Sequence, residues 1–384
     1  MRIDDQDLAD LAALRRDLHA HPELGFAEHR TAAIIAEALR AAGLEVATGI
    51  GGTGVVGTLR NGPGNGAIGF RADMDALPFA EQTGLPYASK TPGVFHGCGH
   101  DGHSATLIGA ARHLAKTRDF SGTIHFIFQP AEEGQGGADA MVRDGLFDRF
   151  PCDRVFALHN WPDLPLGSAR TRPGPIMAAA DRFDITISGK GGHAAMPHQT
   201  PDAILAAATL VQQLHTIVSR RLPPTESAVL SVTKVHGGDS HNVIPASVTL
   251  TGTVRTFSPA VQDRIEESLR QMCEGVARSS ETQIAVDYVR YYPATVNDAE
   301  SAAIALAAAQ AVCGDAAEAP APAFTSEDFA FMLQARPGAY LWMGQRDESH
   351  VAALHHPAYD FNDAVTPIGI AWFAELARTQ LPTG

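Results

Sequence analysis

Eight consecutive residues, 96–103, carry the densest set of metal-binding side chains in the sequence. They read His-Gly-Cys-Gly-His-Asp-Gly-His. Thiolate and imidazole are ligands that Zn(II) and similar ions prefer. The interspersed glycines allow a tight backbone turn, so that neighbouring side chains can converge on one point. The segment therefore predicts a metal site followed by a helix that starts at Ser104. The alternative is a run of surface histidines in a loop.

A pair of adjacent carboxylates, Glu132 and Glu133, follows the apolar run TIHFIFQP. In open α/β sheets, binding sites usually lie at the carboxyl ends of strands. Adjacent side chains point in different directions, so one carboxylate can bind a metal while its neighbour acts as a general base. A Lewis acid beside a general base is typical of metallohydrolases. The alternative is an acidic pair at a solvated helix start.

Weaker candidates come next. Asp73 and Asp75 follow a predicted strand, and such a pair can bind a metal directly or orient a ligand histidine. Several histidines stand outside the dense segment, namely His159, His193, His355 and His356. A lone histidine is more often a hydrogen-bonded structural residue than a ligand, so spacing alone does not assign these.

Composition narrows the function classes. The 384 residues include 29 Lys and Arg against 43 Asp and Glu, which gives a net charge of −14, with 17 His and 4 Cys. The acidic balance argues against partners that are nucleic acids or anionic membranes. The four cysteines form no C-x-x-C pair, which argues against a disulfide framework. The charged start MRIDDQDLAD and the lack of a long apolar run predict a cytoplasmic protein without a membrane helix.

The elements that must position these residues alternate between helix and strand. Apolar periodicity predicts helices up to Pro22 and over 28–42 and 104–115, and strands over 67–70, 123–128 and 154–158. Such alternation is typical of an α/β sheet. The pattern then changes near Ala180. It predicts a strand near 183–187, a helix over 201–220, strands over 228–235 and 247–257, a helix over 259–278 and a strand over 282–289.

The elements predicted after residue 180 follow the order β-α-β-β-α-β, which is typical of a ferredoxin-like α+β domain. The sequence therefore predicts an α/β domain over 1–179 and 294–384 that is interrupted by an inserted domain over 180–293.

Eight motifs spread over the chain, taken together, resemble the M20 metallopeptidase superfamily. Within it they are most similar to the amidohydrolase branch of hippurate hydrolases, N-acyl-L-amino acid amidohydrolases and indole-acetyl-amino acid hydrolases. The motifs are RRDLHAHPELGFAEHRT (15–31), FRADMDALP (70–78), HGCGHDGHSA (96–105), QPAEEG (129–134), LHNWP (158–162), GKGGHAAMPH (189–198), HNVIPA (241–246) and TSEDFAFM (325–332).

The resemblance implies a catalytic domain that holds two divalent metal ions (Zn, Mn, Co or Ni), with an inserted lid or dimerisation domain. It implies that Cys98 bridges the ions, that His100 and His159 hold one, and that Glu133 and His355 hold the other. Glu132 would be the general base. His355 is preferred to His356 as the ligand because it keeps the family's spacing to Pro357.

The resemblance also implies roles outside the metal ligands. His193 would stabilise the oxyanion, often from the partner subunit. Asn242, Arg255 and Gly338 would bind substrate, and Arg255 lies on the polar face of its predicted strand. In the peptidase members a His-x-Asp stands where this chain has Asp73-x-Asp75. The expected role of Asp73, Asp75 and Asp101 is therefore to support the ligands.

The function expected from these residues is metal-dependent hydrolysis of N-acyl amino acids by a homodimer, with a homotetramer as the alternative. Three other functions stay open. The chain could be a dipeptidase or carboxypeptidase on the same scaffold, a non-catalytic metal-binding relative, or a hydrolase that uses Cys98 as its nucleophile.

Overall fold

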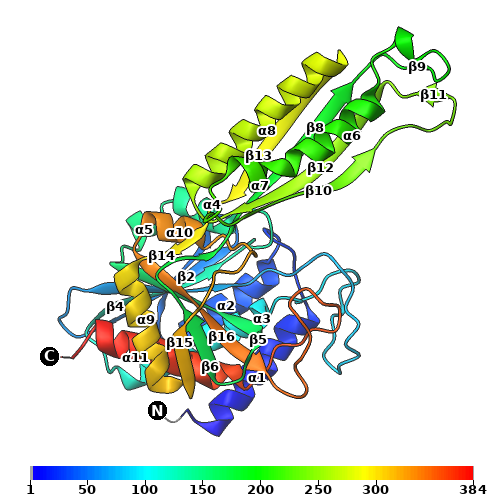
Figure 1. Cartoon of the computed structure of the whole chain (residues 1–384). Coiled ribbons are helices and arrows are strands. Elements are labelled where there is room, and N and C mark those ends of the chain that lie inside the picture. The colour runs from blue at the N-terminus through cyan, green and yellow to red at the C-terminus, as the bar shows by residue number, and fades with distance from the viewer. Residues whose placement is uncertain (1–2, 384) are drawn as a thin grey trace. The chain divides into compact units, whose positions relative to one another are not determined.

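The computed structural model describes residues 3–383, which form two compact units (Figure 1). The first unit contains the described residues up to Ile176, then Thr295–Ala321, and the described chain from Asp328 onward. The second contains Met177–Ala294 and Pro322–Glu327. Residues 322–327 therefore pack with the second unit, although the sequence-based ranges place them in the first domain. Residues 1, 2 and 384, at the ends of the predicted catalytic domain, lie outside the described residues.

An eight-stranded sheet in the order β1-β2-β4-β3-β5-β16-β6-β15 forms the centre of the first unit. Its strands are β1 (Glu45–Ile50), β2 (Gly54–Asn61), β3 (Ala67–Asp73), β4 (Gly122–Gln129), β5 (Arg154–Pro165), β6 (Ser168–Thr171), β15 (Asp315–Glu318) and β16 (Gly338–Arg346). Two short strands, β7 (Gly174–Met177) and β14 (Thr295–Asn297), pair with each other. The mixed α/β architecture expected from the sequence is confirmed.

The helices of the first unit are α1 (Asp5–Ala20), α2 (His29–Ala41), α3 (His100–Thr117), α4 (Gly137–Arg143), α5 (Leu146–Arg149), α9 (Ala299–Val312), α10 (Ala330–Ala335) and α11 (Val365–Gln380). One face of the sheet is apolar. There Phe70 of β3 packs edge-on against Phe126 of β4 and lies 4.8 Å, between ring centroids, from Phe373 of α11. The alternate residues of these strands point to the opposite face, which carries the polar side chains described below.

Parallel pairing brings several motifs to one edge of the sheet. Strand β3 pairs in parallel with both β4 and β5, and β16 pairs in parallel with β5. The register places Asp73 beside Gln129 and His159 beside Trp342. The chain segments that follow β3 and β4 therefore start next to His159, at the carboxyl ends of the central strands.

Helix α3 begins at His100, so the predicted start at Ser104 is wrong by four residues. Gly99 precedes it with φ of 89°, a left-handed conformation that glycine adopts without strain. The first turn of α3 is polar yet fully buried. Apolar periodicity cannot detect such a turn, because its histidines pack against other polar groups.

The second unit has a four-stranded antiparallel sheet in the order β10-β12-β8-β13. Its elements are β8 (Ala179–Ser188), β9 (Gly192–His193), the 3-10 turn Pro197–Gln199, α6 (Ala203–Leu214), α7 (Thr216–Arg221), β10 (Ala228–His236), β11 (Val243–Ile244), β12 (Ser247–Thr256), α8 (Pro259–Ser280) and β13 (Gln283–Tyr292). This is the strand order of a ferredoxin-like unit. The helix predicted over 201–220 is two helices that meet at His215.

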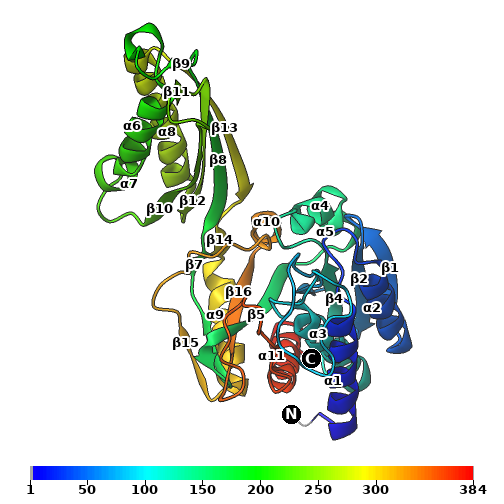
Figure 2. The ribbon, with the colours of Figure 1, turned by 90° about the vertical axis from the view of Figure 1, so that its right-hand side faces the viewer.

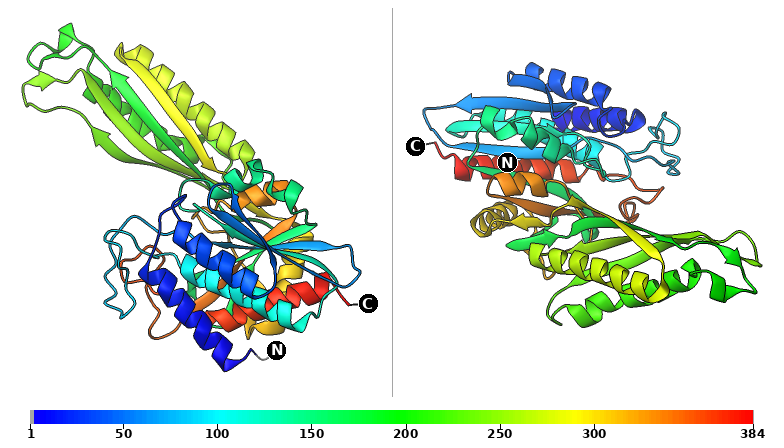
Figure 3. Two further views of the ribbon diagram at one scale, coloured as in Figure 1. Left: turned by 180° about the vertical axis from the view of Figure 1, so that it is seen from behind. Right: turned by 90° about the horizontal axis from the view of Figure 1, so that it is seen from above.

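Helices α6 and α8 lie on the same side of this sheet (Figures 2 and 3). The apolar residues Phe183, Ile185 and Ile187 of β8 alternate toward the helices and pack with Leu210 of α6 and Leu269 of α8. None of the helices within residues 3–383 is long and apolar enough to cross a membrane.

Candidate metal centre and active site

The first group of candidate ligands is fully buried at the carboxyl ends of β3 and β5. Asp73, His100, His103 and His159 each offer one ligand atom, and these atoms all lie within 4.8 Å of one another. His100 and His103 come from the first turn of α3, where helical spacing places them on one face. The early start of α3 therefore brings the dense histidine segment beside His159.

The second group joins the first and is more exposed. Cys98, Glu133 and His355 have ligand atoms within 4.8 Å of one another, and His100, Glu132 and Glu133 form a further such group. The Cys98 Sγ lies 3.5 Å from the His159 Nε2. The structure thus brings together the five residues expected to bind metal, and it places Glu132, the expected general base, beside them.

The structure also distinguishes between the two neighbouring histidines. The His355 Nε2 lies 3.3 Å from the Glu133 Oε1. His356 is exposed, and its Nδ1 accepts a hydrogen bond from the backbone N–H of Ala358. His355 is therefore the one that reaches the cluster.

Hydrogen bonds orient two of the imidazoles for metal binding. The Nδ1 of His100 lies 2.9 Å from the backbone carbonyl of Asp75, and the Nδ1 of His159 lies 2.7 Å from that of Asn160. A carbonyl oxygen only accepts, so each Nδ1 carries a proton, and the Nε2 is the ring atom left to bind a metal. Such a partner on the second nitrogen is the usual arrangement for a ligating histidine.

Two buried atoms in the cluster lack the hydrogen bonds that burial normally requires. The His100 Nε2 and the Glu133 Oε1 form none with the described residues, and they lie 3.9 Å apart. Buried polar atoms normally have a hydrogen-bond partner, so each of these two atoms is available to a bound ion. The donor set of thiol, imidazole and carboxylate fits a divalent metal.

The electrostatics of the cluster also favour a cation. Burial and the charges of Glu133 and Glu132 raise the pKa of the Cys98 thiol well above its ordinary value. Burial lowers the pKa of His100, but the neighbouring carboxylates of Asp73 and Asp75 outweigh it and raise the pKa to about 10. Burial and His103 keep the pKa of His159 well below its ordinary value, so this imidazole is neutral, as a ligand must be.

The three aspartates expected to support the ligands make different contacts. Asp75 accepts from the His100 Nδ1 with one oxygen (3.2 Å) and from the backbone N–H of Glu133 with the other (3.0 Å). Asp73 binds the His103 Nδ1 (2.6 Å) and the Arg71 Nη1 (2.7 Å). Asp75 therefore touches both ligand groups, whereas Asp73 belongs to the first group, and its Oδ2 lies 3.7 Å from the His100 Nε2.

Asp101 points away from the cluster into a buried ionic network. Its Oδ2 lies 2.8 Å from the His19 Nδ1 and 3.7 Å from the Arg15 Nη1. Burial opposes ionisation of Asp101, but the charge and hydrogen bond of His19 hold its pKa far below the usual range. Burial likewise lowers the pKa of His19, and Asp101 and Glu81 overcome that effect and raise it to about 9.

Sequence reasoning missed the buried group on the polar face of the sheet. The Arg71 guanidinium donates to Gln129 (2.7 Å) and Asp73, and its Nη2 lies 3.4 Å from Asp328. The backbone N–H of Asp328 in turn donates to the Glu132 carboxylate at 3.4 Å. The motif TSEDFAFM marks Asp328, but nothing in the sequence indicates its partner 257 residues away.

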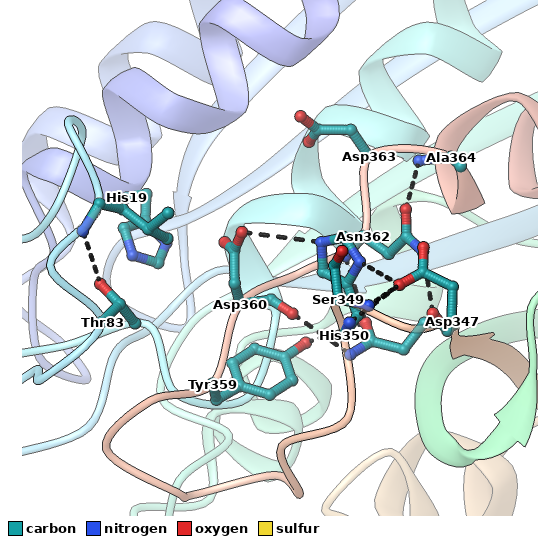
Figure 4. Close-up of polar contacts among 12 residues, drawn as sticks. His19, Thr83, Asp347, Ser349, His350, Tyr359, Asp360, Asn362, Asp363 and Ala364 are labelled. Atoms are coloured by element: carbon teal, nitrogen blue, oxygen red, sulfur yellow. Dashed lines mark hydrogen bonds and ion pairs between the residues drawn. The ribbon is translucent and has the colours of Figure 1, made fainter.

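His355 lies in the loop between β16 and α11. Polar contacts among other residues of this loop hold it together (Figure 4). Asp347 accepts from the Asn362 Nδ2 and binds the His350 Nδ1, each at 2.8 Å. His355 itself has φ of 63°, its side chain is 53% exposed, and its backbone N–H donates to the Gly97 carbonyl. The loop thus connects directly to the histidine-rich segment.

Asn160 is a second residue that sequence reasoning missed. It is fully buried, and its Nδ2 donates to the Tyr359 hydroxyl at 2.6 Å and to the Gln345 Oε1 at 3.0 Å. Its Oδ1 lies 2.7 Å from the His103 Nε2. Asn160 therefore links the His355 loop to the buried ligand group, although only its place after His159 in the motif LHNWP singles it out.

The expected substrate residues do not come together in one place. His193 in β9 pairs with Val243 in β11, beside Asn242, whose carbonyl accepts from Ala194. Arg255 lies near the other end of the second unit's sheet, eight residues beyond the start of β12, which is roughly 27 Å along a strand. Within this unit, His193 and Asn242 are neighbours and Arg255 is remote from both.

Gly338 does not line the cluster. It is the first residue of β16 and is buried beside Val155, whereas Trp342, four residues later, is the neighbour of His159. Four residues of strand span roughly 13 Å. A Cβ at this position would lie 2.1 Å from the Val155 carbonyl oxygen. Close strand packing therefore explains this glycine, and the structure gives no support to the expected substrate contact.

Comparison with known proteins agrees with this geometry. Residues 69–379 match the model of a family described as Peptidase family M20/M25/M40. The chain is 39% identical to a hippurate hydrolase of Campylobacter jejuni over 96% of each chain, and 39% identical to an N-acetylcysteine deacetylase of Bacillus subtilis over 97% of each. A solved structure, the Bacillus subtilis YXEP protein, is described as a dinuclear metal binding peptidase. It is 36% identical, covers 98% of this chain and 99% of its own, and superposes with a TM-score of 0.85.

Proposed function

The chain belongs to peptidase family M20/M25/M40, and we propose that it is a metal-dependent amidohydrolase that cleaves N-acyl amino acids into a carboxylate and a free amino acid. The observation that carries this proposal is the joined ligand cluster with the Glu132 carboxylate beside His100 and Glu133. The chain's similarity to a hippurate hydrolase and an N-acetylcysteine deacetylase supports N-acyl amino acids as the substrate class, with benzoyl or acetyl as the acyl group.

We further propose that the cluster binds two divalent ions of Zn, Mn, Co or Ni. His100 and His159 would hold one ion, Glu133 and His355 the other, and Cys98 would bridge them. The convergence of these thiol, imidazole and carboxylate ligand atoms supports this assignment, as does the His100 Nε2, which is buried without a hydrogen bond. Bound divalent ions would supply Lewis-acid polarisation of the acyl carbonyl and make water more acidic.

Glu132 would move the proton. Its side chain is nearly buried, at 7% exposed, yet its ligand atom lies within 4.8 Å of those of His100 and Glu133. In the proposed reaction it takes a proton from the attacking water and passes the proton to the leaving amine, as a general base and then a general acid. The hydrogen bond from the Asp328 backbone fixes the carboxylate in place.

The second unit would supply the remaining groups. His193 would stabilise the oxyanion, and Asn242 and Arg255 would bind the substrate carbonyl and carboxylate. The separation of Arg255 from His193 and Asn242 within one unit supports a dimer in which the partner's copy of one set completes the site. A homotetramer assembled from such dimers is the alternative. A cytoplasmic location suits a protein with a free thiol, Cys98, at its centre.

A substrate panel tests the proposal. Metal-free protein is reconstituted with Mn(II), Co(II) or Zn(II), and initial rates are compared on N-acetyl and N-benzoyl amino acids and on dipeptides. We expect the acyl amino acids to be hydrolysed faster and all activity to disappear with a chelator. Faster dipeptide cleavage would make the protein a peptidase, activity that survives chelation would favour Cys98 as nucleophile, and metal binding without turnover would indicate a non-catalytic relative.

A further inference from the structure

Glu28 is a buried carboxylate that the proposed reaction does not use. It belongs to the motif at 15–31 and immediately precedes α2, but its side chain does not cap that helix. The residue is 0% exposed, and no cationic side chain of the described chain forms an ion pair with it. A carboxylate is costly to bury without a compensating interaction, so its hydrogen bonds indicate what it is there to hold.

Both oxygens of Glu28 accept a hydrogen bond. The Oε1 accepts from the backbone N–H of Ala131 at 2.8 Å, and the Oε2 accepts from the Thr53 hydroxyl at 2.5 Å. Ala131 is also 0% exposed, so without Glu28 its N–H would be a buried donor with no acceptor.

Ala131 is an unusual point in the backbone. Its φ is 52°, in the left-handed region that favours glycine, and it stands directly before Glu132 and Glu133. Its carbonyl accepts from the backbone N–H of Gly137, which closes the turn on the other side. A Cβ at Gly25 would lie 3.0 Å from Ala131, so the turn has little free space around it.

The two carboxylates, Glu28 and Asp75, thus hold the backbone on either side of Glu132. Glu28 accepts from the amide of residue 131, and Asp75 accepts from the amide of residue 133 at 3.0 Å. We propose that Glu28 is a positioning residue. It fixes the left-handed turn at Ala131 and thereby aims Glu132 and Glu133 into the metal cluster. The inference rests on the proposed function only in taking Glu133 as a ligand and Glu132 as the base.

The competing explanation is that Glu28 merely stabilises the fold. The two explanations differ at Ala131. If Glu28 acts by holding a strained turn, then glycine at position 131, which adopts positive φ without strain, should compensate for its loss. If Glu28 only contributes to general stability, glycine at 131 should raise Tm by relieving the left-handed strain but should leave the metal affinity of the Glu28→Ala variant unchanged.

The test compares Glu28→Ala, Glu28→Gln and the double variant Glu28→Ala/Ala131→Gly with the wild type. The control is Glu23→Ala, which removes a carboxylate that accepts from the backbone N–H groups of Arg30 and Thr31 at the start of α2. Metal-free proteins are titrated with Mn(II) by calorimetry, kcat and KM are measured after reconstitution, and Tm is measured on each protein.

We expect Glu28→Ala to weaken the affinity for one of the two ions by about 10–100-fold, the usual effect of losing a group that orients a ligand, and to lower kcat more than it changes KM. The double variant should recover most of that affinity. Glu28→Gln keeps an acceptor for the Ala131 amide and should stay close to the wild type. Glu23→Ala should lower Tm without changing metal affinity.

The proposal is overturned if Glu28→Ala lowers Tm but leaves metal affinity and kcat unchanged, or if glycine at 131 restores nothing. If Glu28→Ala fails to fold, metal affinity is measured on Glu28→Gln instead. A loss of metal affinity in that variant would contradict the proposal. The metal titration uses no substrate. Its result can therefore be interpreted even if the proposed substrate class proves wrong.

Discussion

The two groups of candidate ligands differ in how firmly the protein holds them. His100 and His159 are buried, stand on α3 and β5, and have their second ring nitrogens bound to backbone carbonyls. His355 stands on a loop, is half exposed and has a left-handed backbone conformation. The regular elements therefore form one side of the metal centre when the chain folds, whereas the other side depends on a surface loop. Four predictions test that contrast.

The largest effect is expected where the two groups meet. Glu132→Gln removes the proposed proton acceptor but none of the proposed ligands, so turnover should fall by roughly 10²–10⁴-fold while both ions remain bound. Steady-state kinetics on an N-acyl amino acid, together with metal analysis of the same sample, checks this. Normal kcat in this variant would remove Glu132 from the mechanism, and loss of metal would make it a ligand.

Removing one histidine from each group compares them directly. We expect His159→Ala to lower metal affinity by more than about 100-fold, beyond the range for losing a merely orienting group, because the buried site has nothing to replace the imidazole. His355→Ala should cause a smaller loss, since water can enter at a half-exposed position. Calorimetric titration of both metal-free variants measures the difference. Equal losses would mean that the loop holds its ligand as firmly as β5 does.

Asp75 touches both groups, so its loss should weaken both ions together. In Asp75→Asn one carboxylate oxygen becomes an NH₂ donor that faces either the His100 Nδ1–H or the Glu133 backbone N–H. We expect metal affinity to fall by about 10–100-fold. Asp298→Asn, at the exposed start of α9, is the matched control and should leave affinity unchanged. If only one ion is affected, Asp75 serves one group alone.

The smallest effect concerns the ionic network behind the buried group. The pKa of His19 is raised from 6.5 to about 9 in the folded protein. Protonated His19 therefore stabilises the fold fully below pH 6.5, and this contribution, on the order of 1–3 kcal/mol, is lost as pH rises through about 9. Urea unfolding of metal-free protein between pH 6 and 9.5 measures it. The decrease should be shallower in His19→Gln, and identical slopes would contradict the assignment.

Elements with strong apolar patterns can be predicted from the sequence, and the fold follows from them. The strands around Phe70, Phe126 and Phe156 are continuous buried runs, and the second unit alternates cleanly along β8. The apolar pattern predicts that β5 ends at Leu158, but the strand continues to Pro165. His159 and Asn160 resemble the start of a loop because polar side chains rarely continue a buried strand. Here Asn160 is satisfied by Tyr359 and Gln345, which come from distant parts of the chain.

Contacts between residues that are distant in the sequence also limit what can be predicted of the site. The local spacing of Cys98, His100 and the Glu132–Glu133 pair indicates metal chemistry, because those residues are close in sequence. Glu28 and Asp328 act on the same pair from positions about 100 and 200 residues away, through hydrogen bonds that leave no periodic trace. In the sequence, a single charged residue such as Glu28 resembles a surface residue, because only the fold shows which distant groups it contacts.

The insertion of one unit within the other has a consequence for the order of synthesis. Strand β5, which carries His159, leaves the ribosome long before β16, which covers its open edge. At about 5–20 residues per second, the interval between residue 165 and residue 338 lasts roughly 10–35 s, and the whole second unit emerges during it. Until then β5 is an uncovered edge, the kind that pairs with other chains. The nascent protein therefore exposes an edge that can pair with other chains while its own insert is being made.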